Sequence, residues 1–457
     1  MSQYQTIKRN AVLFPESEGD FEKAVFALRE ELHELLMDSP DKKAEILQVA
    51  LDTAVDLESY LAEWKLKKVA AQEKIDLASG ELIVFAKNFG APAEAVEAAK
   101  AEIASIAASS CRRFSEMYDE GAMSTVWGHD YASGLEFSLR RGARWVTSNP
   151  CKIQLYKRDF PEKYQAFVEE IKREVPEADA SVKAAKMFTK VCAVSARALR
   201  PIYDATGGEF GFVCMQVDPR EIRNAKAMID QVHFWYRDMA EELGVEIPNV
   251  VFKLPAVKEA FPVVEELLRE KKFRLCMTLN FTVTQHAAFA KLLEKSDKRH
   301  FLVMMAGQFD DKVAGELAGM GYEDAKVIAR YGSEAVMRKS YKMLEDAGYK
   351  NLSIMSAAVR GPWHIKNSFA PAGKAPFYIT TVVPKIQEFD ANPSELSSVI
   401  YEPTDAKMME ILDKSRLFHQ AYDDDGISWE ELFSFPPFVG FFDQFSAAYQ
   451  EIEDDFR

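Results

Sequence analysis

The chain has 457 residues, and its 57 lysine and arginine residues against 72 aspartate and glutamate residues give a net charge of −15. This length suggests about two or three domains and a sizeable core. Hydrophobic residues make up 48% of the chain, which is typical of folded globular proteins and excludes a disordered chain. The negative charge repels a phosphate backbone, so we expect no nucleic-acid partner.

The cysteines are odd in number and widely spaced, which fits neither a zinc site nor a disulfide framework. They are Cys111, Cys151, Cys192, Cys214 and Cys276. We therefore expect reduced thiols and a cytoplasmic protein. Residues 1–15 lack the apolar stretch of a secretory signal. The longest apolar run, 433–442, contains Pro436 and Pro437 and is far shorter than the ~20 residues of a membrane helix, so no membrane partner is expected.

The first part of the chain has a helical pattern. Apolar residues recur there at three- and four-residue steps, as at Phe21, Val25, Leu28 and Leu32. No strand pattern interrupts this series before about residue 120. The sequence therefore predicts a helical extension over residues 1–120.

The sequence pattern then changes to short apolar runs separated by amphipathic segments. This pattern predicts a parallel sheet covered by helices. The eight runs are 123–127, 144–147, 211–215, 249–252, 273–279, 301–305, 352–355 and 377–383. Eight such units over 121–395 favour an α/β fold with a (β/α)₈ TIM barrel, and a doubly wound open sheet is the alternative. Residues 396–457 are expected to form a helical segment packed on the barrel. A capping box of Ser428 and Glu431 is predicted to begin its last helix.

Lys253 lies within an apolar strand, where a charged ammonium group is costly. A lysine in such a place either extends from the strand end to water or serves as a Schiff-base nucleophile. The nucleophile must be a neutral amine, and an apolar pocket favours that form. The flanking residues Val251, Phe252 and Leu254 supply such a pocket in principle. The local pattern leaves both interpretations open.

Five segments in order then resemble one known family. They are Thr147–Ile153, Met215–Arg220, Phe252–Ala256, Cys276–Thr282 with the following Gln285, and Ser356–Arg360. Together they resemble the strand-end motifs of the transaldolase family of class I aldolases, over roughly residues 124–385. Each motif alone is weak, but five in the same order are specific. The resemblance implies the same barrel and an enzyme of carbohydrate metabolism, in the pentose phosphate pathway.

The resemblance also implies a reaction. Lys253 would form a Schiff base with a ketose, and the retained dihydroxyacetone unit would pass to an aldose. Asn149 would hold the dihydroxyacetone hydroxyl groups, although an asparagine before a proline is also a common turn opener. Asp130 would take the proton from the C4 hydroxyl group, with His129 beside it as the alternative register. The imine is the electron sink, so neither metal nor organic cofactor is expected.

The chain departs from the family at several positions. Gln216 replaces a glutamate that works through a water molecule with the threonine retained here as Thr278. Gln308 stands at the place of a phosphate-binding arginine, and Ala358 stands at the place of a serine. Of the family's phosphate ligands only Arg360 remains. The substrate is therefore expected to be a sugar or a sugar phosphate.

Two alternatives follow from these departures. A glutamine at position 216 also occurs in the fructose-6-phosphate aldolase branch, which favours cleavage of a ketose with release of free dihydroxyacetone. A barrel that has lost part of its site could also serve as a binding or assembly module. A homo-oligomer is compatible with either alternative, and the number of subunits stays open.

Overall fold

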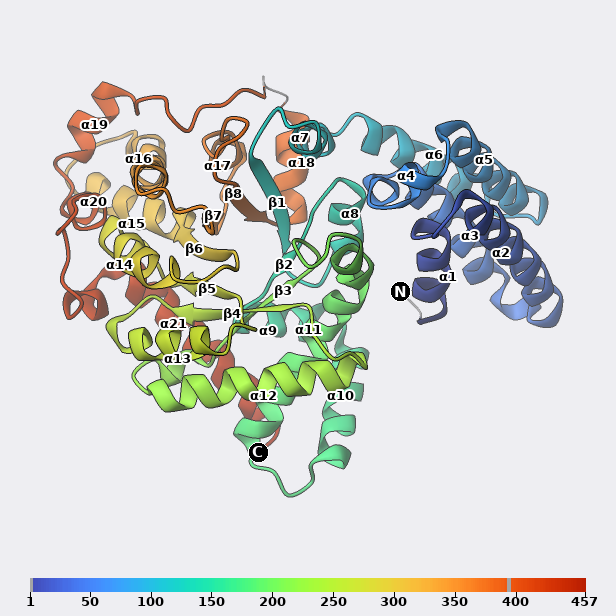
Figure 1. Ribbon diagram of the computed structural model, residues 1–457, viewed down its shortest axis with the longest axis horizontal. Coiled ribbons are helices and arrows are strands. Elements are labelled where there is room, and N and C mark those ends of the chain that lie inside the picture. The colour runs from blue at the N-terminus through green and yellow to red at the C-terminus, as the bar shows by residue number, and fades with distance from the viewer. Residues whose placement is uncertain (1–2, 393–395) are drawn as a thin grey trace. The chain divides into compact units, whose positions relative to one another are not determined.

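In the computed structural model, residues 3–392 and 396–457 are described. Eight parallel strands form a closed barrel in chain order, with each strand next to its sequence neighbours and β8 beside β1 (Figure 1). The strands are β1 Thr125–Asp130, β2 Val146–Thr147, β3 Val213–Gln216, β4 Val250–Pro255, β5 Leu275–Thr278, β6 His300–Met305, β7 Leu352–Ala357 and β8 Phe377–Thr381. The predicted (β/α)₈ barrel is confirmed, and the closed order excludes the open sheet.

Helices connect and cover these strands, because parallel neighbours require a crossover between them. They are α8 Leu135–Arg140, α9 Pro150–Asp159, α10 Pro161–Glu174, α11 Ala180–Ala205, α12 Ala225–Leu243, α13 Phe261–Arg269, α14 Val283–Leu293, α15 Ala306–Gly319, α16 Ala325–Asp346, α17 Pro362–Lys366 and α18 Val383–Ala391. Strand residues are buried almost throughout, which explains why the strands read as unbroken apolar runs.

Four aromatic rings fill the barrel interior below the strand ends. Trp145 lies 4.6 Å from Tyr378 and 5.9 Å from Phe212, measured between ring centroids. Phe301 closes the ring, at 5.4 Å from Phe212 and 4.9 Å from Tyr378. Gly128 makes room for this layer, since a Cβ there would lie 2.4 Å from Cε2 of Trp145. The layer is a packed floor, so chemistry is confined to the carboxyl ends of the strands.

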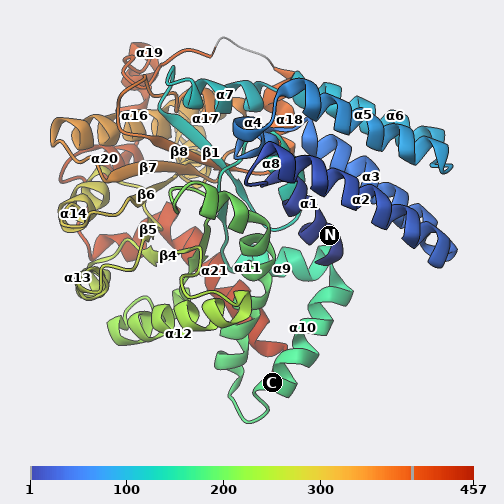
Figure 2. The ribbon, with the colours of Figure 1, turned by 45° about the vertical axis from the view of Figure 1, so that its right-hand side comes forward.

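The chain divides into two compact units, and the first is helical. Its main helices are α1 Gln3–Leu13, α2 Glu18–Asp38, α3 Lys43–Leu57, α4 Leu66–Val69, α5 Gln72–Asn88 and α6 Ala93–Ala107, and α7 Ser110–Asp119 begins in it. The long helices pack side by side (Figure 2).

The first unit also includes residues 136–143 and 198–211, which come later in the chain. Buried Asp56 holds the first of these segments, since its carboxylate pairs with Nε of Arg140 at 2.7 Å. The predicted boundaries at residues 120 and 395 stay predictions, and residue 395 lies outside the described residues.

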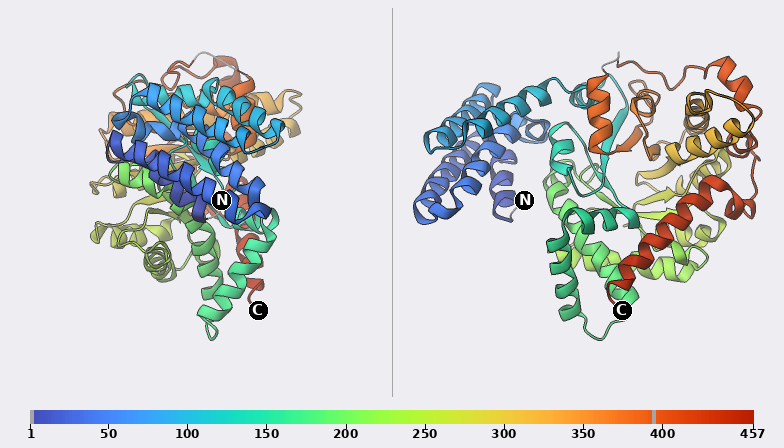
Figure 3. Two further views of the ribbon diagram at one scale, coloured as in Figure 1. Left: turned by 90° about the vertical axis from the view of Figure 1, so that its right-hand side faces the viewer. Right: turned by 180° about the vertical axis from the view of Figure 1, so that it is seen from behind.

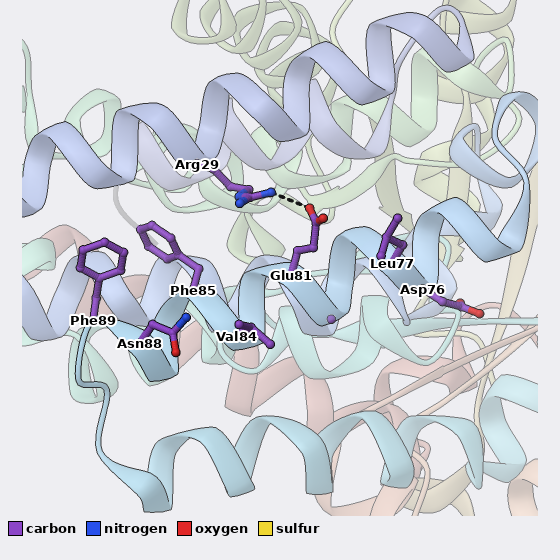
Figure 4. Close-up of a pocket in the computed structure, with 9 residues that line it drawn as sticks. Arg29, Asp76, Leu77, Glu81, Val84, Phe85, Asn88 and Phe89 are labelled. Atoms are coloured by element: carbon purple, nitrogen blue, oxygen red, sulfur yellow. Dashed lines mark hydrogen bonds and ion pairs between the residues drawn. The ribbon is translucent and has the colours of Figure 1, made fainter.

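An open pocket of about 500 Å³ lies between α2 and α5 within this helical unit (Figure 4). Leu77, Val84 and Phe85 line it, and Nη1 of Arg29 pairs with the Glu81 carboxylate at 2.6 Å across it. The pocket offers no amine nucleophile, so it is not a place for Schiff-base chemistry.

The last part of the chain is helical, with α19 Ala406–Leu412, α20 Arg416–Tyr422 and α21 Pro436–Asp454. Ser428 and Glu431 do form the reciprocal bonds of a capping box. The box begins a short 3₁₀ turn and not α21, which corrects the prediction. The long helix begins only at Pro436, because proline suits the first helical position. Within the described residues, no helix combines the length and hydropathy that a bilayer-spanning segment needs.

Candidate active site

Lys253 extends into the barrel. Its Nζ donates to the carbonyl oxygen of Ser148 at 3.2 Å. Ser148 directly follows β2, and Lys253 lies two strands away on β4, so the bond crosses the interior in front of β3. The Lys253 side chain is buried, with the residue only 4% exposed. The alternative of an edge lysine extending to solvent is therefore wrong.

Strand register then identifies the other inward side chains, because paired residues of parallel strands face the same side and alternate residues face the same way. Inward-facing residues near the carboxyl ends of the strands, here called the inward layer, are Asp130, Thr147, Gln216, Lys253, Thr278, Met305, Ala357 and Thr380. The four predicted catalytic residues Lys253, Asp130, Gln216 and Thr278 therefore all face the barrel interior near its mouth.

Asp130 is held as a charged carboxylate. Its Oδ1 accepts a hydrogen bond from Thr147 at 2.9 Å, and its Oδ2 pairs with Nζ of Lys152 at 2.9 Å. Burial acts to raise the pKa of Asp130, but the charges of Lys152 and Lys253 outweigh it and hold the pKa below its ordinary value. A carboxylate close enough to feel the charge of the Lys253 ammonium group is placed to exchange protons near the imine.

His129 faces away from this layer. Its Nε2 donates to the carbonyl oxygen of Ser133 at 2.8 Å, within its own strand-end loop. Burial lowers the pKa of His129 to about 4, so the imidazole is neutral at pH 7. Of the two registers expected from the sequence, the structure places Asp130 inside.

Gln216 is the register partner of Lys253 and is buried. No hydrogen-bond donor among the described residues reaches its side-chain Oε1. An unpaired buried oxygen is costly, so it is suited to accept a bond from a water molecule or a substrate hydroxyl group. Thr278 lies on β5, and its hydroxyl group contacts only the Met305 sulfur at 3.8 Å among the described side chains.

Two cysteines lie directly below these groups. Cys276 pairs in register with Lys253, and Cys214 lies two residues before Gln216 on β3. Burial and a hydrogen bond with the Cys276 thiol raise the pKa of Cys214 well above its ordinary value. Cys214 is thus a neutral neighbour of the lysine, and Cys276 is a second buried thiol beside it.

Asn149 has a structural role that the sequence anticipated. It is the N-cap of α9, and its Oδ1 accepts from the backbone N–H of Lys152 at 3.3 Å. The residue stands two positions beyond Thr147, at the edge of the inward layer. The expected turn is the start of helix α9, and the cap leaves the side-chain amide nitrogen of Asn149 as the group that could donate to a substrate.

Among the residues expected to bind phosphate, the one cation, Arg360, is already paired with a carboxylate. Arg360 pairs with Asp311, with Nη2 at 2.9 Å and Nε at 3.1 Å from the same carboxylate oxygen. Gln308 lies on the first turn of α15 against α21, because a Cβ on Gly440 would lie 2.4 Å from its Nε2. Ala358 has a φ of 57° and offers only its carbonyl oxygen, to Nη1 of Arg360.

Helix α21 crosses the carboxyl-terminal face of the barrel (Figure 3). Phe435, at its N-cap, contacts Phe281 after β5, and Gly440 contacts Gln308 after β6. Further along, the backbone of Gln444 accepts from Cys151 after β2, at 3.8 Å.

The end of α21 reaches the segment that follows β3. Nη2 of Arg220 lies 2.7 Å from the Glu453 carboxylate, and its Nη1 bonds Gln450 at 2.6 Å. The loops after four strands are thus fastened to one helix that covers the mouth.

Sequence reasoning missed three features of this site. Lys152, which holds Asp130, lay inside a quoted motif, and its position on the first turn after β2 was the available signal. Asp311 pairs with Arg360 although it lies 49 positions earlier in the chain, which no local pattern indicates. Asn280 follows β5 fully buried, with neither amide atom partnered among the described residues.

These observations can be compared with known proteins. A sequence model described as transaldolase/fructose-6-phosphate aldolase matches residues 130–432, more than half of the chain. The chain belongs to this family of enzymes. The resemblance inferred from the five motifs is confirmed. Residues before Asp130, which include α1 to α7, lie outside the matched range.

Individual relatives are transaldolases as well, and their alignments cover smaller parts of this chain than the family model does. Transaldolase 1 of Streptomyces avermitilis is 27% identical over 216 residues, which cover 43% of this chain and 55% of the relative. A transaldolase of Mycobacterium ulcerans is 26% identical over 257 residues, which cover 52% of this chain and 66% of the relative. Transaldolase 2 of Streptomyces coelicolor is 27% identical over 162 residues, which cover 32% and 41%. The chain spans about half the length of the curated relatives it matches.

Proposed function

We propose that this protein transfers a dihydroxyacetone unit from a ketose to an aldose through a Schiff base on Lys253, as a cytoplasmic enzyme. The single observation that carries the proposal is the buried Lys253 amine inside the barrel mouth, in the same layer as the Asp130 carboxylate. Membership of the transaldolase family supports it. The expectation that no metal or cofactor takes part rests on the resemblance.

The proposed reaction begins when the neutral amine of Lys253 attacks the ketose C2 carbonyl. Loss of water gives a protonated imine. Asp130 then accepts the C4 hydroxyl proton, the C3–C4 bond breaks, and its electron pair moves into the imine to form an enamine. The aldose leaves, a second aldose accepts the enamine carbon, and water hydrolyses the new imine to release the product and free Lys253.

The surrounding groups fit this sequence of steps. Lys152 keeps Asp130 ionised and therefore able to accept a proton. Gln216 and Thr278 flank Lys253 on the neighbouring strands and can orient the water that leaves and later returns. Asn149 would donate its amide N–H to a hydroxyl group of the bound dihydroxyacetone unit.

Gln216 favours a second function at the same site. A glutamine can orient water but cannot take a proton from it. The site therefore has one proton-transfer group fewer for passing the dihydroxyacetone unit to an acceptor. In that case the enzyme would cleave a ketose and release free dihydroxyacetone. Turnover of the ketose without any added aldose would identify this aldolase activity, whereas a strict need for an acceptor would identify the transferase.

The deciding experiment is chemical trapping. The protein is incubated with dihydroxyacetone or fructose 6-phosphate, reduced with borohydride, digested and mapped by mass spectrometry. We expect a mass gain on the peptide that contains Lys253 and none in Lys253→Met. Lys258→Met is the matched control, because this exposed lysine lies five residues further on and should leave the adduct intact.

Each result has one interpretation. A gain confined to Lys253 supports the Schiff-base proposal, and a gain that persists in Lys253→Met contradicts it. No gain with any ketose, from protein that circular dichroism shows to be folded, would favour the binding module instead.

A further inference from the structure

Three cations that follow strands at the mouth are paired with carboxylates. Lys152 after β2 pairs with Asp130, and Arg220 after β3 pairs with both Asp218 and Glu453. Arg360 after β7 pairs with Asp311. A phosphate group that bound here would have to displace a carboxylate from its partner, which removes most of the attraction.

The wall formed by β6 and β7 lacks hydrogen-bond donors in its upper layers. Its inward residues there are Val303 and Met305 on β6 and Met355 and Ala357 on β7. All four are buried. The wall opposite the lysine is therefore apolar, and it supplies no group that recognises an anion.

The first turn of α15, which follows β6, is closely packed on one side. A Cβ on Gly307 would lie 2.1 Å from the carbonyl oxygen of Ala358 and 2.6 Å from Cγ of Arg360. The Ala358 carbonyl oxygen and the Arg360 side chain therefore leave little space on this side of the helix. The carboxylate of buried Asp310 is already bonded to Ser333 and His364.

The unsatisfied buried groups near the lysine are neutral. Gln216 leaves its side-chain oxygen without a donor, and Asn280 leaves both amide atoms without a partner among the described residues. Amide groups pair well with hydroxyl groups, which both donate and accept. These residues therefore suit a polyol chain and not a dianion.

We infer that the substrates of this site are uncharged sugars, without a phosphate group at the end remote from the carbonyl. The inference rests on the proposed function, and it names the substrate class that the site selects. The paired arginine and the apolar β6–β7 wall both disfavour a phosphate group. A neutral ketose needs only hydroxyl contacts beyond the imine.

The test compares fructose with fructose 6-phosphate, with each concentration corrected for its open-chain keto fraction. We expect kcat/KM to be at least about tenfold higher for fructose, and we expect no inhibition by inorganic phosphate beyond that of chloride at equal ionic strength. Asp311→Asn should free Arg360 and raise kcat/KM for fructose 6-phosphate by about tenfold while leaving fructose within twofold. Asp346→Asn removes the same charge on α16 and should change neither value.

A wild-type preference for fructose 6-phosphate, with competitive inhibition by phosphate, overturns this inference and leaves the Schiff-base function standing. Loss of that preference in Lys312→Met would then identify the ligand, because Lys312 lies beside Gly440 near the same helix terminus. If neither sugar forms an adduct at Lys253, the proposed function is overturned, and this inference falls with it.

Discussion

The two walls of the barrel mouth differ in chemistry although they share one fold. From β1 to β5 the residues of the inward layer are all polar, and they include Asp130 and Lys253. On β6 and β7 they are Met305 and Ala357. The polar wall holds most of the residues that resemble the family's reaction centre, and the segments after β6 and β7 have lost all but one of the family's phosphate ligands. A barrel can thus keep its reaction centre while the opposite side changes what it accepts.

The largest expected effect comes from removing the base on the polar wall. Asp130→Asn keeps the shape and an acceptor for Thr147 but cannot take the C4 proton. We expect kcat for ketose cleavage to fall by roughly 10² to 10⁴-fold, while borohydride still traps an adduct on Lys253. Asp159→Asn, which changes a carboxylate outside the inward layer, is the control. Unchanged turnover in Asp130→Asn would show that Asp130 is not the base.

A substitution on the apolar wall should affect stability and not chemistry. Met355 is fully buried and faces inward on β7. Met355→Ala should lower the free energy of unfolding by about 2 to 5 kcal/mol, because it leaves a cavity. Urea denaturation measures this change, and kcat per folded molecule should stay within a few-fold. Met320→Ala, at an exposed position, should cost far less, and a large loss of kcat in Met355→Ala would place chemistry on this wall.

The smallest effect is a shift in pH dependence. Lys152 is the main charge that lowers the pKa of Asp130, and burial acts in the opposite direction. In Lys152→Met the pKa of Asp130 should rise, so the carboxylate protonates at higher pH. The acidic limb of the kcat/KM profile should therefore move upward in pH.

Lys157→Met is the matched control for this shift, because Lys157 lies on the same helix and pairs with Asp455. An acidic limb that stays in place in Lys152→Met would mean that another group is the base.

The sequence alone predicted the features that depend on residues close together in the chain. Eight apolar runs gave the eight strands, because a strand buried on both faces needs no partner information to be recognised. The motifs placed Lys253, Gln216 and Thr278 correctly at strand ends. The choice between His129 and Asp130 needed the register with β2, since neighbouring strand residues face opposite sides.

What the sequence could not predict depends on distant contacts. No sequence pattern near Arg360 indicates that it will pair with Asp311. The same holds for residues 136–143, which join the first helical unit through Asp56. Such pairings arise only when the chain has closed the barrel and its loops have been brought together.

The crossing of α21 over the mouth has a consequence for the order of assembly. Its partners near Cys151, Arg220 and Gln308 are translated long before it, and Cys151 precedes Gln444 by 293 positions. A nascent chain that has already made all eight strands still lacks this cover. The mouth of the barrel is therefore covered only after α21 has been translated, so a chain that stopped before Pro436 would have a barrel without this helix.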